Sequence, residues 1–256
     1  MLGGIVVLVA RNRRALSASG MVAATAVAII STAAGWTWAM ILIAFFVSAT
    51  VLSRYRAQAR DAVVGDMVAK GGERDARQVA ANGGVFAAAA IASIVHPSAI
   101  WLSVGAGAIA ASTADTWATE IGTLATHEPR LITTGRLVPT GTSGGVSWPG
   151  SLAGVAGAIF IGAVVHLAGW GAAATFAAIG GGVAGMLVDS LAGASIQSRR
   201  WCGSCEKPTE RLVHSCGTTT ETRGGIRWVD NDAVNAISSI AGAVAGSIIP
   251  VWLPPS

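Results

Sequence analysis

ADTWATEIGTLATHEPRLITTGRLVPTGTSGGVSWPG, residues 114–150, is a polar, Gly/Thr/Ser-rich stretch between segments that are almost free of charge. Apolar side chains make up 52% of the 256 residues and charged ones only 12%. This composition excludes a disordered chain and is typical of membrane proteins. Glycine, with 33 residues, and alanine outnumber leucine, which suits helices whose backbones approach closely in a bilayer. The sequence therefore predicts an all-α, polytopic transmembrane helical bundle.

The basic residues show which ends of the helices share a side of the membrane. All 17 Lys and Arg residues fall into the windows 11–14, 54–77, 130–136 and 199–227. If a pair of spans separates each window from the next, all of them lie on one side, which the positive-inside rule assigns to the cytoplasm. The net charge of +4 then reflects topology, and nucleic acid is not an expected partner. We expect an integral protein of the plasma membrane of a prokaryote.

The apolar runs predict about seven spans in a single integral-membrane domain, residues 1–256. Hairpins are expected over 15–53, 83–114 and 150–198, turning near Gly35, at His96-Pro97 and at 169–171, with a last span over 233–252. Trp36 and Trp38 are expected at the membrane interface. Residues 1–10 are too short to cross the hydrocarbon core and form a shortened or tilted first segment. Cytoplasmic loops are expected over 54–82, 114–150 and 199–230, the first as a solvated surface helix pair.

Acidic residues within or beside apolar runs are the first candidates for chemistry. Asp115, Glu120, Asp189 and Asp232 each lie at the cytoplasmic end of a predicted span, and Asn235 follows Asp232 on the same polar stripe. A carboxylate in a bilayer is costly unless it is paired, bound to a cation or hydrated. We therefore expect these side chains to converge on one site. The alternative for any one of them is a helix cap or an ion pair with a loop arginine.

The second candidate is the glycine loop, residues 140–145 (TGTSGG). Glycines allow left-handed turns in which successive N–H groups form an anion-binding nest, and Thr and Ser hydroxyls add donors. No Walker A motif is present, and a plain connector is the alternative. The candidate phosphate-binding residues are Arg130, Thr134, Arg136, Thr140, Gly141, Thr142, Ser143, Gly144 and Gly145.

The third candidate is the Cys/His cluster, which we define as Cys202, Cys205, His214 and Cys216. The pattern is C-x2-C-x8-H-x-C on a predicted cytoplasmic loop. A disulfide is not expected in that reducing compartment, and three thiolates with one imidazole match a structural tetrahedral Zn²⁺ site. Free thiols are the alternative.

These motifs together resemble the multi-pass membrane family known as domain of unknown function 92. The resemblance rests on DTWATEIG (115–122), PRLITTGR (129–136), VPTGTSGGVS (138–147), DSLAGA (189–194), the cysteine motifs and NDAVN (231–235). That family includes plant phytyl-phosphate kinases. A more distant similarity, through the Asp-Thr-x-Ala stretch and the glycine loop, is to CTP-dependent phytol and dolichol kinases.

The resemblance implies a kinase that transfers a phosphoryl group from CTP or another nucleoside triphosphate to an isoprenoid monophosphate in the bilayer. Asp115 and Asp189 would hold Mg²⁺, Asp232 and Asn235 would assist, and the glycine loop with Arg130 and Arg136 would cradle phosphates. One alternative is a kinase acting on a prenyl alcohol. Another is a transporter or flippase for a phosphorylated lipid, which predicts acids near the bilayer centre and a path open to both sides. A scaffold that binds another protein through the Cys/His cluster is a third; a lipid phosphatase lacks an evident nucleophile and base.

Overall fold

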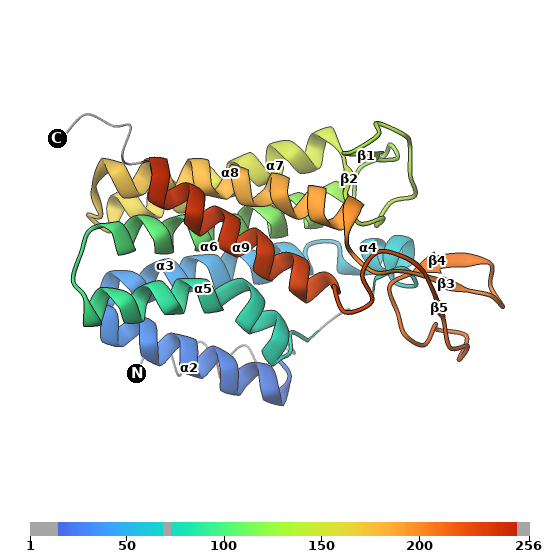
Figure 1. Cartoon of the computed structure of the whole chain (residues 1–256), viewed down its shortest axis with the longest axis horizontal. Helices are drawn as coiled ribbons and strands as arrows, with labels where there is room; N and C mark the ends of the chain where they lie inside the picture. Colours follow the sequence, from blue (N-terminus) through green and yellow to red (C-terminus); the bar gives the residue numbers. More distant parts are fainter. Residues whose placement is uncertain (1–14, 69–72, 250–256) are drawn as a thin grey trace.

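The structure, a computed structural model, describes residues 15–68 and 73–249. The predicted segment 1–10 and the last residues of the final predicted span lie outside these ranges. The described chain forms helices and two small sheets (Figure 1). The helices are α2 (Ala18–Ala34), α3 (Trp36–Arg54), α4 (Ala57–Val64), α5 (Ala76–Val95), α6 (Ile100–Gly122), α7 (Trp148–Leu167), α8 (Gly171–Ser195) and α9 (Asn231–Ile248). The strands are β1 (Arg130–Leu131), β2 (Gly145–Val146), β3 (Arg199–Cys202), β4 (Lys207–Thr209) and β5 (Glu221–Gly224).

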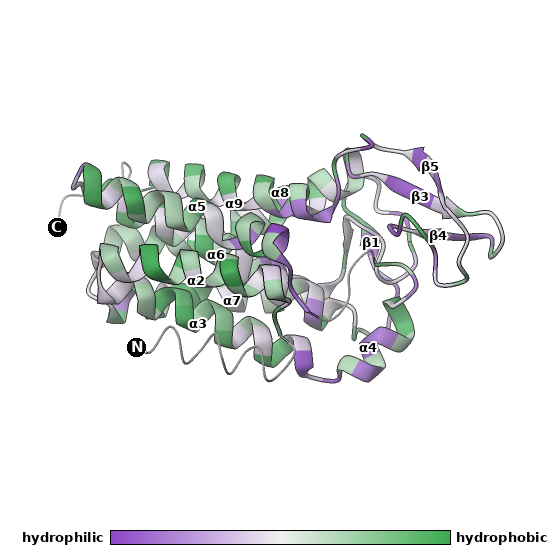
Figure 2. Ribbon diagram, turned by 90° about the horizontal axis from the view of Figure 1, so that it is seen from below, coloured by the Kyte–Doolittle hydropathy of each residue, from purple (hydrophilic) through white to green (hydrophobic). Residues whose placement is uncertain are grey.

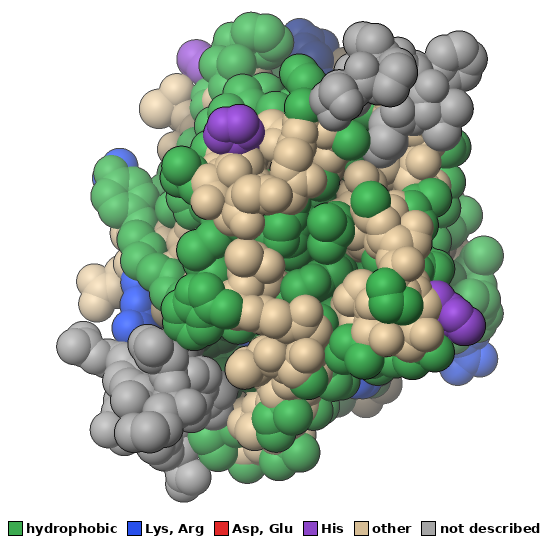
Figure 3. All heavy atoms as spheres, turned by 90° about the vertical axis from the view of Figure 1, so that its left-hand side faces the viewer, with side chains coloured by type: hydrophobic (Ala, Val, Ile, Leu, Met, Phe, Trp, Pro, Cys, Tyr) green, Lys and Arg blue, Asp and Glu red, His purple; other side chains and the backbone are tan. Residues whose placement is uncertain are grey.

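The long helices lie side by side, and α4 and the strands gather at one end of the bundle (Figure 1). Hydrophilic residues concentrate at that end, and the helices are mainly hydrophobic (Figure 2). Within the described chain, α3, α5, α7 and α8 are long and apolar enough to cross a membrane, and α2 is a shorter apolar helix. The opposite end shows mainly hydrophobic side chains with backbone and other side-chain atoms between them, and Lys or Arg atoms only at the rim of the view (Figure 3). No acidic side chain is visible among its described residues. The predicted all-α membrane bundle is confirmed.

The helical hairpins turn where the sequence predicts. Gly35 separates α2 from α3 with a φ of 137°, Pro97 lies between α5 and α6, and residues 168–170 join α7 to α8. Trp36 is exposed, as an interfacial side chain should be. Trp38 differs from Trp36, because its ring is buried against Phe86 and Trp170, with centroid distances of 5.1 and 4.6 Å, and it therefore packs inside the bundle.

Helix α6 is the centre of the bundle, and it contacts α3, α5, α7, α8 and α9. Residues 105–114 of this helix are all buried. Small residues permit this packing, most closely at the glycine junction, which we define as Gly107 of α6, Gly181 of α8 and Gly242 of α9. A Cβ on Gly242 would lie 2.5 Å from the carbonyl oxygen of Gly107 and 3.1 Å from that of Gly181. The three helices are therefore in backbone contact, which fixes their mutual rotation.

The polar loops contain regular structure, of which the sequence predicts only the helix pair over 54–82. In that segment α4 forms, and the second helix is the start of α5, which begins at Ala76, where Asp75 and Gln78 make a capping box. In the 114–150 stretch, α6 continues to Gly122 before the antiparallel pair β1–β2. The 199–230 loop folds into an antiparallel sheet of order β4-β3-β5. These helices and strands hold in fixed positions side chains that an irregular loop would leave in solvent.

Candidate functional site

A polar cleft of about 370 Å³ lies at the charged end of the bundle. Helices α4, α5, α6, α8 and α9 and the glycine loop all contribute to its wall. Most of the residues predicted from the sequence converge on it. The predicted site residues that line the cleft are Asp115, Glu120, Thr140, Gly141, Thr142, Ser143, Gly144, Gly145, Asp189, Asp232 and Asn235.

Asp115 and Asp189 form a carboxyl pair in this cleft. Helices α6 and α8 both run toward the charged end, and each acid follows the junction glycine of its own helix, Gly107 or Gly181, by the same number of residues. The two side chains therefore reach the same depth and hydrogen-bond each other. Oδ2 of Asp189 is buried and has no hydrogen-bond partner among the described residues. Two carboxyl groups in contact, with an unsatisfied oxygen, need a proton or a cation between them.

Glu120 has a different environment, although it lines the same cleft. Its carboxylate forms an ion pair with Arg60 of α4 and accepts a hydrogen bond of 2.6 Å from the Ser53 hydroxyl. Burial lowers the pKa of the Arg60 guanidinium, but the carboxylates of Glu120 and Asp61 together outweigh this effect and raise the pKa above its ordinary value. The pair ties α4 to the ends of α3 and α6, which is the loop-arginine alternative considered from the sequence.

Asp232 and Asn235 bring α9 to the cleft. Asp232 is buried, and its Oδ2 lies 3.8 Å from Nε of Arg77. Arg77 also pairs with Asp230, the N-cap of α9, at 2.9 Å. The first turn of α9 is therefore held against the start of α5, and it presents one carboxylate and one amide to the cleft.

The glycine loop has the conformation expected of an anion nest. Gly141 and Gly144 have positive φ values of 90° and 76°. Gly144 packs on the end of α8, where a Cβ would lie 2.5 Å from Cβ of Ala194. None of the described residues accepts a hydrogen bond from the backbone N–H of Gly141, Ser143 or Gly144. These N–H groups can bind the oxygens of a phosphate.

Arg130, Thr134 and Arg136 do not line the cleft. They lie exposed on the outer part of the β1–β2 hairpin, where Nη1 of Arg130 donates to the Gly135 carbonyl oxygen at 2.8 Å. This difference has a local reason for Arg130, because its guanidinium is bonded back to its own hairpin at Gly135, whereas Arg136 is simply exposed.

The cleft also contains polar side chains that no sequence motif predicts. Arg74, Gln78 and Asn82 line the cleft, and their four-residue spacing on and before α5 is a helical signal that the charged window concealed. Nη2 of Arg74 donates to the Ser53 hydroxyl at 3.2 Å, and no described carboxylate forms an ion pair with it. Burial lowers the pKa of Arg74 below its ordinary value, opposed by the nearby Glu120. An arginine so placed is suited to bind an anion.

Glu210 was also missed, because it lies in the 199–230 loop without a distinctive motif. Its carboxylate accepts hydrogen bonds from the Ser143 hydroxyl and, at 2.8 Å, from Nε2 of Gln197. Glu210 thus joins the glycine loop to the end of α8.

A small apolar groove, with a volume of about 90 Å³, opens beside the cleft between α2, α3 and α5. Val27, Leu42 and Phe46 are among its apolar walls. The groove and the cleft share Arg74 and Gln78, along with Asn82 and Thr116. A ligand with a charged head and an apolar chain could occupy both.

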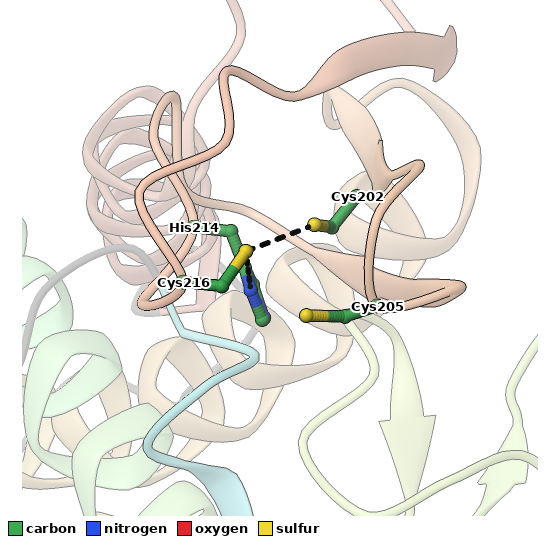
Figure 4. Close-up of side chains that lie close together, drawn as sticks. All are labelled: Cys202, Cys205, His214 and Cys216. Carbon is green, nitrogen blue, oxygen red and sulfur yellow. Dashed lines mark hydrogen bonds between the residues drawn. The ribbon is translucent and has the colours of Figure 1, made fainter.

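The Cys/His cluster lies outside the cleft, in the segment of residues 199–230 that contains the β4-β3-β5 sheet and that we call the excursion (Figure 4). One ligand atom from each of its four side chains lies within 4.8 Å of the others. Hydrogen bonding with the Thr218 hydroxyl and with the His214 ring lowers the pKa of the Cys216 thiol to about 6. Hydrogen bonding to Cys216 and burial raise the pKa of Cys205 to about 11.

Comparison with known proteins places these features in a family. A family model described as Integral membrane protein DUF92 matches residues 1–243. The chain is 28% identical over 269 residues to Protein PGR of Arabidopsis thaliana, covering 94% of this chain and 91% of that protein. It is 30% identical over 247 residues to an uncharacterised membrane protein of Methanocaldococcus jannaschii, covering 96% and 90%. An uncharacterised membrane protein of Synechocystis is 28% identical over 84% of this chain and 74% of its own. No solved structure matches the chain.

Proposed function

The chain belongs to the integral membrane protein family DUF92, and from this premise we propose that it is a membrane-embedded kinase. It transfers a phosphoryl group from CTP or another nucleoside triphosphate to an isoprenoid monophosphate, which becomes the diphosphate. Similarity to Protein PGR is compatible with this activity. The observation that carries the proposal is the placement of the Asp115–Asp189 pair and the unbonded N–H groups of the glycine loop in one cleft.

The donor nucleotide occupies the cleft with its phosphates on the glycine loop. Phosphoryl transfer needs positioned phosphates and neutralised charge more than it needs covalent participation by the protein. The N–H groups of Ser143 and Gly144 bind phosphate oxygens, and Asp115 and Asp189 are the residues that would hold Mg²⁺. The carboxyl pair fits this ion because Oδ2 of Asp189 is unsatisfied and hard oxygen ligands suit Mg²⁺. When bound, the ion neutralises charge on the nucleotide phosphates. Asp232 and Asn235 line the same wall and orient groups around it.

The acceptor lipid occupies the apolar groove and the adjoining part of the cleft. Its isoprenoid chain lies against the apolar walls of α2 and α3, and Arg74 binds its phosphate where groove and cleft meet. An oxygen of that phosphate forms a bond to the γ-phosphorus. The bond from the γ-phosphorus to the bridging oxygen breaks, and the nucleoside diphosphate leaves. Because the attacking oxygen is already ionised, no general base is required.

The position of the cleft favours a kinase over a transporter. A transporter of a phosphorylated lipid needs a path that reaches both sides of the membrane. The described residues that line the cleft belong to the charged end of the bundle. By the positive-inside rule this end faces the cytoplasm, where nucleoside triphosphates are present. A prenyl alcohol acceptor would need a general base near Arg74. The phosphate of a prenyl monophosphate needs only the guanidinium cation of Arg74.

The test is a transfer assay with purified protein in detergent micelles and Mg²⁺. γ-Labelled CTP, ATP, GTP and UTP are each combined with prenyl alcohols and prenyl monophosphates of several chain lengths. We expect label in a prenyl diphosphate, and we expect Asp115→Asn and Asp189→Asn to reduce turnover at least about 100-fold. Glu128→Gln, an exposed carboxylate outside the cleft, is the matched control and should keep full turnover. Absence of transfer with every pair, in folded protein, would refute the kinase and direct attention to liposome uptake.

A further inference from the structure

The Cys/His cluster brings together side chains from three parts of the 199–230 excursion. Cys202 ends β3, Cys205 lies in the turn before β4, and His214 and Cys216 follow β4. Figure 4 shows the four side chains directed toward a common point. Sγ of Cys202 lies 3.6 Å from Sγ of Cys216, which lies 3.3 Å from Nδ1 of His214. Within the described chain, this is the group of side chains with the separations of a metal site.

The sulfur–sulfur and nitrogen–sulfur separations given above match tetrahedral zinc coordination. With Zn–S bonds of about 2.3 Å and Zn–N bonds of about 2.0 Å, neighbouring ligand atoms lie roughly 3.4–3.8 Å apart. The observed sulfur–sulfur and nitrogen–sulfur distances fall within a few tenths of an ångström of this range. Three thiolates and an imidazole favour Zn²⁺ over hard cations, which prefer oxygen ligands. All four positions are filled by the protein, so the site has no open position for substrate and is structural.

The excursion needs such a site because it has almost no apolar core. Among residues 199–230, the buried apolar side chains are those of Cys202 and Val229. The sheet has only three short strands, and a unit of this size usually requires a metal or disulfides to fold.

The excursion also reaches the polar cleft through residues 209–211. The Thr209 hydroxyl donates to the Asp66 carbonyl oxygen at 2.9 Å. The Glu210 N–H donates to the Met67 carbonyl oxygen at 2.7 Å. Nε of Arg211 donates to the Val68 carbonyl oxygen at 3.0 Å. These bonds hold the segment against the end of α4 and bring the Glu210 carboxylate to the Ser143 hydroxyl. Residues 209–211 lie between Cys205 and His214, so the metal site secures both ends of the segment.

We propose that the Cys/His cluster binds one structural Zn²⁺, and that this ion orders the excursion so that Glu210 holds the glycine loop against α8. The inference does not depend on the kinase reaction. The zinc ion positions Glu210 and does not contact substrate.

The first experiment measures metal in the full-length protein, purified in detergent without chelators, by mass spectrometry. We expect stoichiometric zinc, and replacement with Co²⁺ should give near-ultraviolet thiolate-to-metal absorption together with the visible d–d bands of a tetrahedral site. His214→Ala and Cys216→Ser should lose most of the metal. His214→Cys keeps four soft ligands and should retain it, and His127→Ala, an exposed histidine outside the cluster, is the matched control.

The second experiment tests the link to Glu210 by hydrogen exchange and limited proteolysis. Removal of zinc by a chelator should increase exchange in residues 207–216 and in the glycine loop, and should expose the excursion to cleavage. Metal-free wild-type protein with three reactive thiols, or with a disulfide detected by mass spectrometry, would overturn the zinc site. Zinc binding without any change in the glycine loop upon its removal would overturn the positioning role of Glu210. Both readouts are independent of turnover, so they remain valid whatever the transfer assay shows.

Discussion

Replacement of Gly242 by alanine tests the glycine junction, because it adds one methyl group where three helices meet. The new Cβ would lie 2.5 Å from the Gly107 carbonyl oxygen and 2.6 Å from Cβ of Ala111. Both distances are roughly 1 Å inside van der Waals contact. The obstructing atoms belong to the backbone or to a Cβ, so no side-chain rotation relieves the overlap, and α9 must move away from α6.

The expected free energy follows from two opposing effects. Alanine in a helix is favoured over glycine by about 1 kcal/mol, whereas overpacking of a close-packed interior costs about 1–3 kcal/mol. Because several atoms obstruct the methyl group at once, we place the overlap cost at or above the top of that range. The net loss is then about 2 kcal/mol, which corresponds to a fall in Tm of roughly 4–8 °C for a chain of this length.

The assay is thermal unfolding of the purified protein in detergent, followed by tryptophan fluorescence. Gly84→Ala is the matched control, since this glycine is also helical but a Cβ there meets nothing within 4 Å. Its Tm should stay unchanged or rise, because only the helix propensity changes. An equal or higher Tm for Gly242→Ala would refute the backbone contact between α6 and α9.

Three further predictions concern the cleft. Arg74→Ala should raise KM for the phosphorylated acceptor at least about tenfold and leave KM for the nucleotide unchanged, and Arg74→Lys should recover part of the loss. Equal effects on both KM values would argue against a phosphate contact at Arg74. Glu120→Gln leaves Arg60 with only the exposed Asp61 carboxylate as an ion-pair partner and should lower the stability by about 1–3 kcal/mol in thermal unfolding. Arg60→Met combined with Glu120→Gln should lose less than the sum of the single changes. Gly144→Ala introduces a side chain at a φ of 76° and against Ala194, so it should weaken nucleotide binding by calorimetry, and unchanged affinity would exclude a nest at this position.

Much of the architecture was predictable from local sequence. The lengths of the apolar runs, Pro97 and the glycines at 35, 169 and 171 place the helical hairpins, because a helix that crosses a bilayer requires about 20 apolar residues and ends where the backbone must turn. The grouping of Lys and Arg predicts which helix ends share a side. Asp115 and Asp189 were visible as candidates because an acid in an apolar run is costly without a partner.

The helices, the charged end and the acids that need partners are all predictable from local sequence, since they depend on composition and on periods of a few residues. The identity of each partner depends on tertiary packing. Asp115 contacts Asp189 because glycines allow α6 and α8 to pack closely. Glu120 pairs with Arg60 because α4 lies against the end of the bundle. Arg130 and Arg136 lie exposed on the β1–β2 hairpin outside the cleft, whereas Arg74 and Glu210 line it from segments that the sequence assigns to the solvated surface. Contacts between distant segments depend on how helix faces pack and how loops turn, and no local pattern encodes either.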